Sequence, residues 1–148
     1  MKALRCFKSL GCLLAFLTLA GCDKDVSRNS AAEVAKIFGK QTLEQALEKA
    51  KTDGKVVMID FYADWCGPCK KLDADTWTDA KVQEWLLAKT VPLKIDVDAM
   101  PALAQKHSVS SIPALVFLKP DGTEIGRLTG LQSPAAFLGK AGDLLRGM

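Results

Sequence analysis

The sequence predicts a three-layer α/β sandwich in which helices flank a central mixed β-sheet. Two observations support this fold class. Short apolar runs typical of buried strands alternate along the chain with amphipathic segments typical of helices. The last two apolar runs are separated only by a tight turn, so these two strands are expected to form a hairpin. Strands and helices in this order fit a mixed sheet.

The first helix is expected to begin after Thr42. Thr42 and Gln45 have the spacing of a capping box, and the apolar residues that follow lie on one helical face. Asp53-Gly54 ends this helix, and Val56–Ala63 is a short apolar run of the kind expected for a buried central strand. A helix is expected directly after this strand. The elements expected after that helix are a helical segment from Thr78-Asp79, a strand at Val91–Val97, a short helix at Ala99–Lys106, strands at Ala114–Leu118 and Glu124–Thr129, and a last helix.

Local signals define the remaining boundaries. The helix that follows the first strand is expected to be interrupted at Asp75–Asp79. This stretch supplies the break in place of a proline, since no proline lies between Pro68 and Pro92. Pro120–Gly122 is a turn between the last two strands. Ser133-Pro134 begins the last helix, because a capping serine is followed by proline at the first helical position.

Three of the five cysteines lie in the first 22 residues, in a segment with the features of an export signal. A basic start is followed by an apolar stretch at residues 10–20 and by Leu19-Ala20-Gly21-Cys22. This segment resembles a bacterial lipoprotein signal, which implies that residues 1–21 are removed and that Cys22 carries the lipid. An ordinary secretory signal without lipid is the alternative. A transmembrane anchor is disfavoured, because about eleven apolar residues fall short of the roughly twenty needed to span a bilayer.

About 126 residues follow Cys22, enough for one domain with a core and too few for two. Residues 22–36 are expected to form a flexible tether spanning roughly 20 Å, and residues 37–148 the domain. The alternative is that Ala31 to Phe38 already belongs to the fold. The removed segment contains three of the 20 basic residues and none of the 17 acidic ones, so the mature protein is near neutral. No basic patch with interleaved aromatics indicates nucleic-acid binding.

Cys66-Gly67-Pro68-Cys69 follows the first predicted strand directly. Two cysteines at this spacing can close a small disulfide, and a sulfur at a helix N-terminus gains thiolate character from unpaired backbone N–H groups. Cys66 would attack a substrate disulfide, and Cys69, one turn along, would resolve the mixed disulfide. After export these two cysteines are the only ones left to pair, apart from a lipidated Cys22, so their role is catalytic rather than structural.

The sequence around this motif, over residues 37–148, resembles the thioredoxin family. The matching features are Trp65 beside the first cysteine, Asp60 in the preceding strand and Ser111-Ile112-Pro113 ahead of a later strand. A closer likeness is to the C-terminal thioredoxin-like domain of transmembrane thiol-disulfide interchange reductases, which works in the bacterial periplasm. The phrases Phe61–Cys66, Asp79–Gln83 and Leu128-Thr-Gly carry that likeness.

The resemblance implies roles for several residues. Pro113 would be a cis-proline, the Ile112 main chain would pair with an extended substrate segment, and Trp65 would frame the Cys66 sulfur. Asp60 would accept the proton of the Cys69 thiol. The sequence supports this independently, because a carboxylate within an apolar strand is costly to bury charged and tends to have a raised pKa.

Asp73 is a candidate second acid, four residues after Cys69 and therefore on the same helical face. A second carboxylate there would disfavour thiolate formation, whereas a solvated helix aspartate is the alternative. A zinc site is not expected, because His107 and two thiols fall short of four ligands. No cofactor is expected.

These observations favour a monomeric, membrane-tethered thiol-disulfide oxidoreductase that faces the periplasm. Asp23 after the lipidated cysteine suggests retention in the inner membrane. Its expected substrates are disulfide-bearing exported proteins, in cytochrome c maturation or in general disulfide repair. Its expected electron donor is a transmembrane thiol reductase. A disulfide oxidase or isomerase of the same fold, and a tethered chaperone-like binding module, are the alternatives.

Overall fold

A computed structural model of the protein describes residue 32 and residues 34–148. The predicted signal segment, Cys22 and most of the predicted tether lie outside these residues. Four strands form one sheet in the order β2-β1-β3-β4. Their bounds are Val56–Tyr62 for β1, Thr90–Asp96 for β2, Ala114–Leu118 for β3 and Glu124–Thr129 for β4. β1 pairs parallel with β2 and antiparallel with β3, so the predicted mixed sheet is confirmed.

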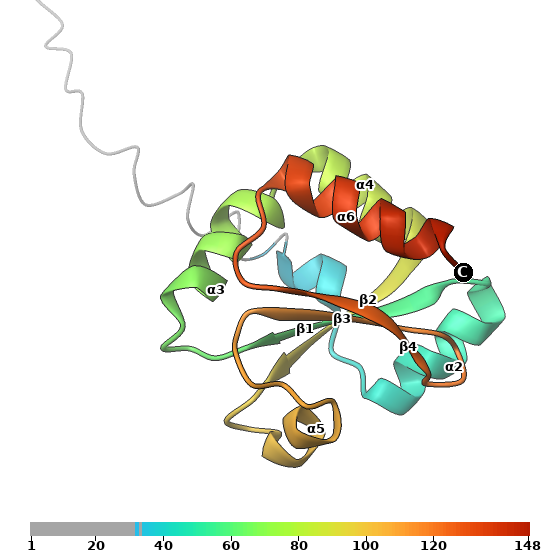
Figure 1. Cartoon of the computed structure of the whole chain (residues 1–148), viewed down its shortest axis with the longest axis horizontal. Coiled ribbons are helices and arrows are strands. Elements are labelled where there is room, and N and C mark those ends of the chain that lie inside the picture. The colour runs from blue at the N-terminus through green and yellow to red at the C-terminus, as the bar shows by residue number, and fades with distance from the viewer. Residues whose placement is uncertain (1–31, 33) are drawn as a thin grey trace, which may run out of the picture.

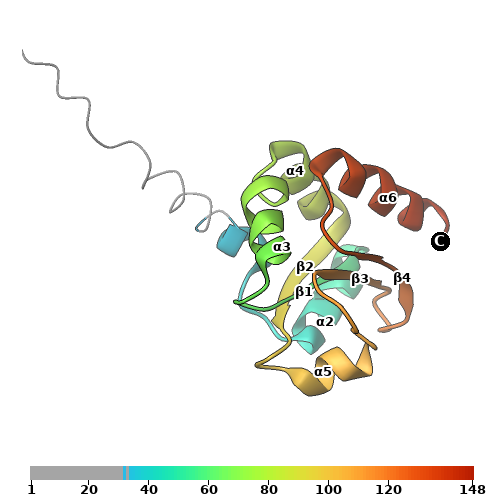
Figure 2. The same cartoon turned by 60° about the vertical axis from the view of Figure 1, so that its left-hand side comes forward.

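Helices cover both faces of the sheet (Figures 1 and 2). α4 and α6 pack together on one face, and α2 and α5 lie on the other. Their bounds are Leu43–Asp53 for α2, Gly67–Lys71 for α3, Ala80–Lys89 for α4, Pro101–Lys106 for α5 and Pro134–Arg146 for α6. The predicted three layers are therefore present.

Side chains of β1 alternate between two hydrophobic clusters, as the period of a strand requires. Val56 and Met58 point to the cluster under α4 and α6, whereas Val57 and Ile59 point to the cluster under α2 and α5. Asp60 continues the first series. The strand therefore directs this one carboxylate into the interior on the α4 and α6 side.

The dithiol helix is interrupted where the sequence predicted a break. α3 continues into a π-helical turn over Leu72–Thr76, and Trp77 N–H donates to the Leu72 carbonyl at 3.0 Å. Asp79 then caps α4 by accepting from the N–H groups of Lys81 and Val82. The π-helical form of the turn was not predicted. Such turns are rare and often occur at functional sites.

The segment before Gly39 packs against the core of the domain. Residues 34–38 are helical, and Val34 and Phe38 are buried in the cluster under α4 and α6. The Phe38 ring meets the Trp77 ring edge-on at 5.4 Å. These buried apolar side chains favour the alternative in which the segment that ends at Phe38 already belongs to the fold.

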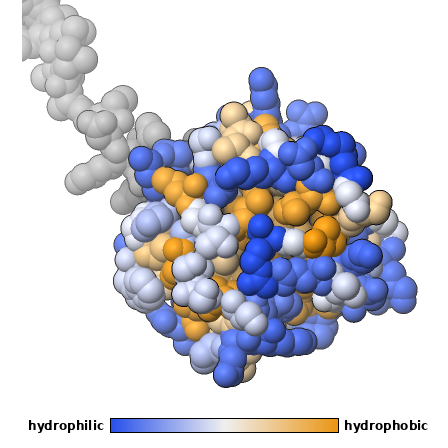
Figure 3. Space-filling model, viewed as in Figure 1, coloured by the Kyte–Doolittle hydropathy of each residue, from blue (hydrophilic) through white to orange (hydrophobic). Residues whose placement is uncertain are grey.

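A glycine lies at the hydrophobic contact between β4 and α6. Gly126 lies so close to α6 that an added Cβ would be 2.7 Å from Leu144 Cδ2. Figure 3 shows hydrophobic areas between these two elements, within a mainly hydrophilic surface. The partly buried Ile125, Leu144 and Leu145 belong to this packing.

Candidate active site

The two cysteines lie where β1 gives way to α3. Cys66 is the N-cap residue of α3, and Gly67 and Pro68 form the first turn. Cys66 and Cys69 are joined by a disulfide, and Cys69 N–H donates to Cys66 Sγ at 3.2 Å. Both are buried, with 3% and 2% of their surface exposed. Cys66 thus occupies the helix-terminal position that stabilises a thiolate once the disulfide is reduced.

Asp60 lies in the interior on the α4 and α6 side of β1, with only 1% of its surface exposed. Trp77 Nε1–H donates to Asp60 Oδ2 at 3.0 Å, and Lys94 Nζ is 3.5 Å from the same oxygen. Within the described part of the chain, no protein group donates to the buried Oδ1. Oδ2 is therefore held by two donors, and Oδ1 is the oxygen left to take up a proton.

Burial raises the pKa of Asp60 from 3.8 to about 6. The charge of Lys94 and the hydrogen bond from Trp77 oppose this rise, whereas the charge of Asp73 adds to it. Desolvation outweighs the attraction of Lys94 because the carboxylate has lost nearly all contact with water. A carboxyl group with this pKa can exchange protons near neutral pH.

Lys94 connects the two carboxylates. It stands opposite Asp60 in the β1–β2 register and ion-pairs with both Asp60 and Asp73. Its ammonium also lies 4.6 Å from the centre of the Tyr62 ring and 5.5 Å from that of Phe38. One lysine, enclosed by two aromatic rings, is thus shared between a buried and a half-buried carboxylate.

Asp73 is therefore not simply a solvated helix residue. It lies in the π-helical turn, four residues before Trp77, and both side chains reach the Asp60–Lys94 pair. Asp73 is ion-paired to Lys94 while its side chain stays 36% exposed. Its predicted effect on the thiolate stays a prediction.

Trp65 forms an exposed rim beside the disulfide. Its side chain is 69% exposed, and Nε1–H donates to Asp98 Oδ2 at 2.7 Å. Asp98 belongs to the loop between β2 and α5, and Val97 of that loop packs against the Cys66 region. The loop after the second parallel strand therefore holds the indole in place.

On the other side of the disulfide, the Ile112–Pro113 peptide bond is cis, as expected. Ile112 packs against the cluster of Ala63, Cys66 and Cys69. Its main-chain N–H and C=O make no hydrogen bond to any described residue. The Pro113 carbonyl accepts from Gly130 N–H at 2.8 Å. An unpaired main-chain edge thus lies beside the two sulfurs, as peptide docking requires.

Sequence reasoning missed Lys94 and Asp98. Lys94 was detectable in principle, because it is the one basic residue in the apolar run that forms β2. A register between β1 and β2 would have been needed to place it opposite Asp60. Asp98 carries no such signal, since an aspartate in a loop is ordinary until the fold brings it to the Trp65 indole.

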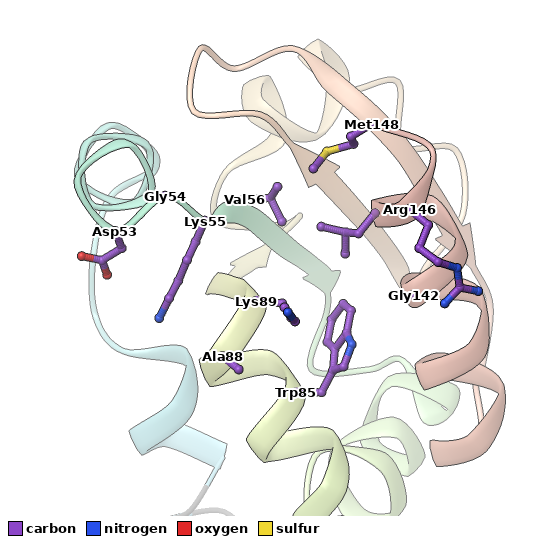
Figure 4. Close-up of a pocket in the computed structure, with 11 residues that line it drawn as sticks. Asp53, Gly54, Lys55, Val56, Trp85, Ala88, Lys89, Gly142, Arg146 and Met148 are labelled. Carbon is purple, nitrogen blue, oxygen red and sulfur yellow. The ribbon is translucent and has the colours of Figure 1, made fainter.

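The cavity in Figure 4 lies away from the disulfide, and the described residues offer no set of metal ligands there. Among the described residues, no group of three or more histidine, cysteine or acidic side chains could hold a metal ion. The cavity in Figure 4, of about 460 Å³, is lined by Lys55 and Val56 at the start of β1 and by Trp85 of α4. The disulfide follows the other end of that strand. The cavity is therefore separate from the dithiol, and we place the chemistry at Cys66.

This geometry defines the class of protein. A disulfide whose first sulfur lies at a helix N-terminus, next to a cis-proline edge, is built for exchange between a dithiol and a disulfide. The chain is a thiol-disulfide oxidoreductase.

The chain belongs to the thioredoxin-like domain family, whose model matches residues 43–144. It is 32% identical over 135 residues to the thiol:disulfide interchange protein DsbD of Colwellia psychrerythraea. That alignment covers 86% of this chain and 22% of that protein. The chain is 45% identical over 80 residues to a thioredoxin of Chlamydia trachomatis, covering 52% of this chain and 71% of that one. The chain thus spans about a fifth of the length of the interchange protein.

A solved structure supports the same relationship. The oxidised C-terminal domain of Neisseria meningitidis DsbD superimposes with a TM-score of 0.57 at 25% identity, covering 80% of this chain and 95% of that domain. This agrees with the resemblance to the interchange-reductase domain. Among the described helices, none is long and apolar enough to cross a membrane.

Proposed function

We propose that the protein reduces disulfides in exported proteins while a lipid on Cys22 tethers it to the bacterial inner membrane, facing the periplasm. The Cys66 thiolate attacks one sulfur of the client disulfide and expels the other as a thiolate. The Cys69 thiol gives its proton to Asp60 and attacks Cys66 Sγ, which closes the Cys66–Cys69 disulfide and releases the second client thiolate. Two electrons pass to the client.

The observation that carries this proposal is the Cys66–Cys69 disulfide at the start of α3, together with a carboxyl group buried in the preceding strand β1 whose pKa is about 6. Asp60 can hold a proton transiently at neutral pH, and its Oδ1 is free to take one. Gly67-Pro68 between the cysteines and Ile112 before the cis-proline resemble the combination in reducing thioredoxins. These features favour reduction over oxidation.

Continued turnover needs electrons, because each cycle leaves the protein oxidised. We propose a transmembrane thiol reductase as the donor, in keeping with the likeness to interchange proteins. The clients belong to cytochrome c maturation or to general disulfide repair. We propose that the domain acts as a monomer; the cycle needs only the two cysteines of one chain.

The test is the reduction potential of the Cys66–Cys69 pair in the full-length protein, equilibrated in detergent against thiol buffers. A value near −270 mV, that of thioredoxin, supports a reductase. A value near −120 mV, at the strongly oxidising end, would instead indicate a disulfide oxidase.

Mass spectrometry of the protein from its native membrane tests the lipid on Cys22. An N-terminal segment that is unmodified or uncleaved would contradict the tether.

A further inference from the structure

Gln132 is a buried polar residue that the cycle above does not use. It lies between β4 and α6 with 4% of its surface exposed. Its side-chain NH₂ donates to the carbonyl oxygens of Thr129 at 3.1 Å and Gly130 at 3.0 Å. Lys140 Nζ donates to its Oε1 at 2.9 Å. Both ends of the amide are therefore matched, since its donors face carbonyls and its acceptor faces an ammonium.

The main chain of the same residue is tied to the helix that carries the dithiol. The buried Thr76, at the end of the π-helical turn, donates from Oγ1 to the Gln132 carbonyl at 2.6 Å. Gly130, held by the Gln132 side chain, donates from its N–H to the Pro113 carbonyl at 2.8 Å. A chain of hydrogen bonds thus runs from the cis-proline segment through Gln132 to the dithiol helix.

We propose that Gln132 is a positioning residue that holds the cis-proline edge in register with the dithiol, so that a polypeptide disulfide docked on Ile112 meets Cys66. This rests on the proposed reduction of protein disulfides. The side-chain amide stabilises the one loop conformation in which Gly130 N–H reaches Pro113. Without it, the loop is free to leave that conformation, and the docking edge is competent for only a fraction of the time.

The expected effect follows from that fraction. A typical hydrogen bond shifts such an equilibrium roughly fivefold, so losing two donors shifts it about 25-fold, and the competent fraction, which falls by less than the equilibrium constant, drops roughly tenfold. The apparent affinity for a docked polypeptide falls by the same factor. A small disulfide that contacts only the sulfurs needs no docking edge, so its reaction is unaffected. Selective loss of polypeptide reduction is therefore the signature of this role.

The test is Gln132→Glu in the full-length protein, with dithiothreitol as the electron source. Glutamate keeps the size and the contact to Lys140, but it sets an oxygen against the Thr129 and Gly130 carbonyls. We expect KM for a disulfide-bearing peptide to rise roughly tenfold. We expect kcat, and the rate with a small aromatic disulfide, to stay within about twofold. Unchanged peptide KM, or an equal loss with both substrates, would overturn the proposal.

Gln41→Glu is the matched control. Gln41 also donates from its side-chain amide to a main-chain carbonyl, that of Pro92 at 3.3 Å, on the outer edge of β2. The Gln41→Glu variant should leave the reduction of both substrates unchanged.

Should Gln132→Glu fail to fold, Thr76→Val removes the hydrogen bond to the Gln132 carbonyl while keeping the side-chain shape. It is expected to raise peptide KM roughly fivefold and to spare the small disulfide. Equal loss with both substrates would again overturn the proposal. A wild-type protein that reduces neither substrate would refute the proposed function itself.

Discussion

The two sides of the disulfide differ in burial and therefore in what they control. On the sheet side, Asp60 and Lys94 are largely removed from water. Asp73, which is partly exposed, ion-pairs with Lys94 at the surface. On the rim, Trp65 and Asp98 meet at the surface. Charges interact strongly where water is excluded and weakly where it is not. The buried side is thus suited to setting protonation, and the rim to contacting a partner.

The largest effect is expected at the sulfurs that both sides serve. Cys66→Ser should lower disulfide reduction to less than about a thousandth, because no nucleophile of comparable reactivity remains. Cys69→Ser should also stop turnover, but it should trap Cys66 in a mixed disulfide with the client. Non-reducing electrophoresis distinguishes the two variants. A trapped species in Cys66→Ser rather than in Cys69→Ser would reverse the assigned roles.

Asp60→Asn should separate activity from stability on the buried side. Loss of the proton acceptor is expected to slow reduction at pH 7 roughly 10–100-fold. Folding raises the pKa of this acid from 3.8 to about 6, so the folded state binds more protons across that interval. The contribution of Asp60 to wild-type stability therefore falls as pH rises from about 4 to 6, and this cost persists above pH 6. The full rise corresponds to about 3 kcal/mol.

Asparagine carries no such charge and can keep the hydrogen bond from Trp77. We therefore expect Asp60→Asn to be more stable than the wild type at pH 7.5, by roughly 2 kcal/mol, and to lose this advantage at pH 4. Denaturant unfolding at the two pH values checks this. If the variant and the wild type differed in unfolding free energy by the same amount at pH 7.5 and at pH 4, Asp60 would be charged without penalty. The basis for its role in proton transfer would then be removed.

Sequence reasoning located the active site better than it located the groups that tune it. The cysteine pair, the buried Asp60 and Pro113 belong to local patterns that remain visible in one dimension. Lys94 becomes a partner of Asp60 only through the pairing of β1 with β2, some 30 residues apart in the sequence. Gln132 likewise gains its role from contacts with distant elements. Local chemistry could be predicted, whereas tertiary register could not.

Asp73→Asn is expected to act more mildly, through Lys94. The negative charge of Asp73 raises the pKa of Asp60, and its removal also leaves Lys94 free to pair with Asp60 alone. Both changes lower the pKa of Asp60. The pH profile of reduction should therefore move to lower pH, with a change in rate of only a few-fold at pH 7. Asp75→Asn, an exposed neighbour in the same turn, is the control and should leave the profile in place.

The smallest effect is expected on the rim. Asp98→Ala removes the acceptor of the Trp65 indole N–H, and an exposed hydrogen bond to a charged group contributes about 1 kcal/mol. A less restrained indole should raise KM for a disulfide-bearing peptide about two- to fivefold. Asp121→Ala is the control, because Asp121 accepts from Thr123 N–H within its own hairpin turn, away from Trp65.

The pH profile decides what the Asp98 result means. The contrast between the two sides requires that Asp98→Ala leave this profile unmoved, because the exposed carboxylate is screened from Asp60 by solvent. Asp73→Asn, which changes a charge in the buried network, must move it. If Asp98→Ala shifted the profile as far as Asp73→Asn does, the rim would be electrostatically coupled to the dithiol. Docking and protonation would then belong to one network, and a partner bound at Trp65 could itself tune the reactivity of Cys66.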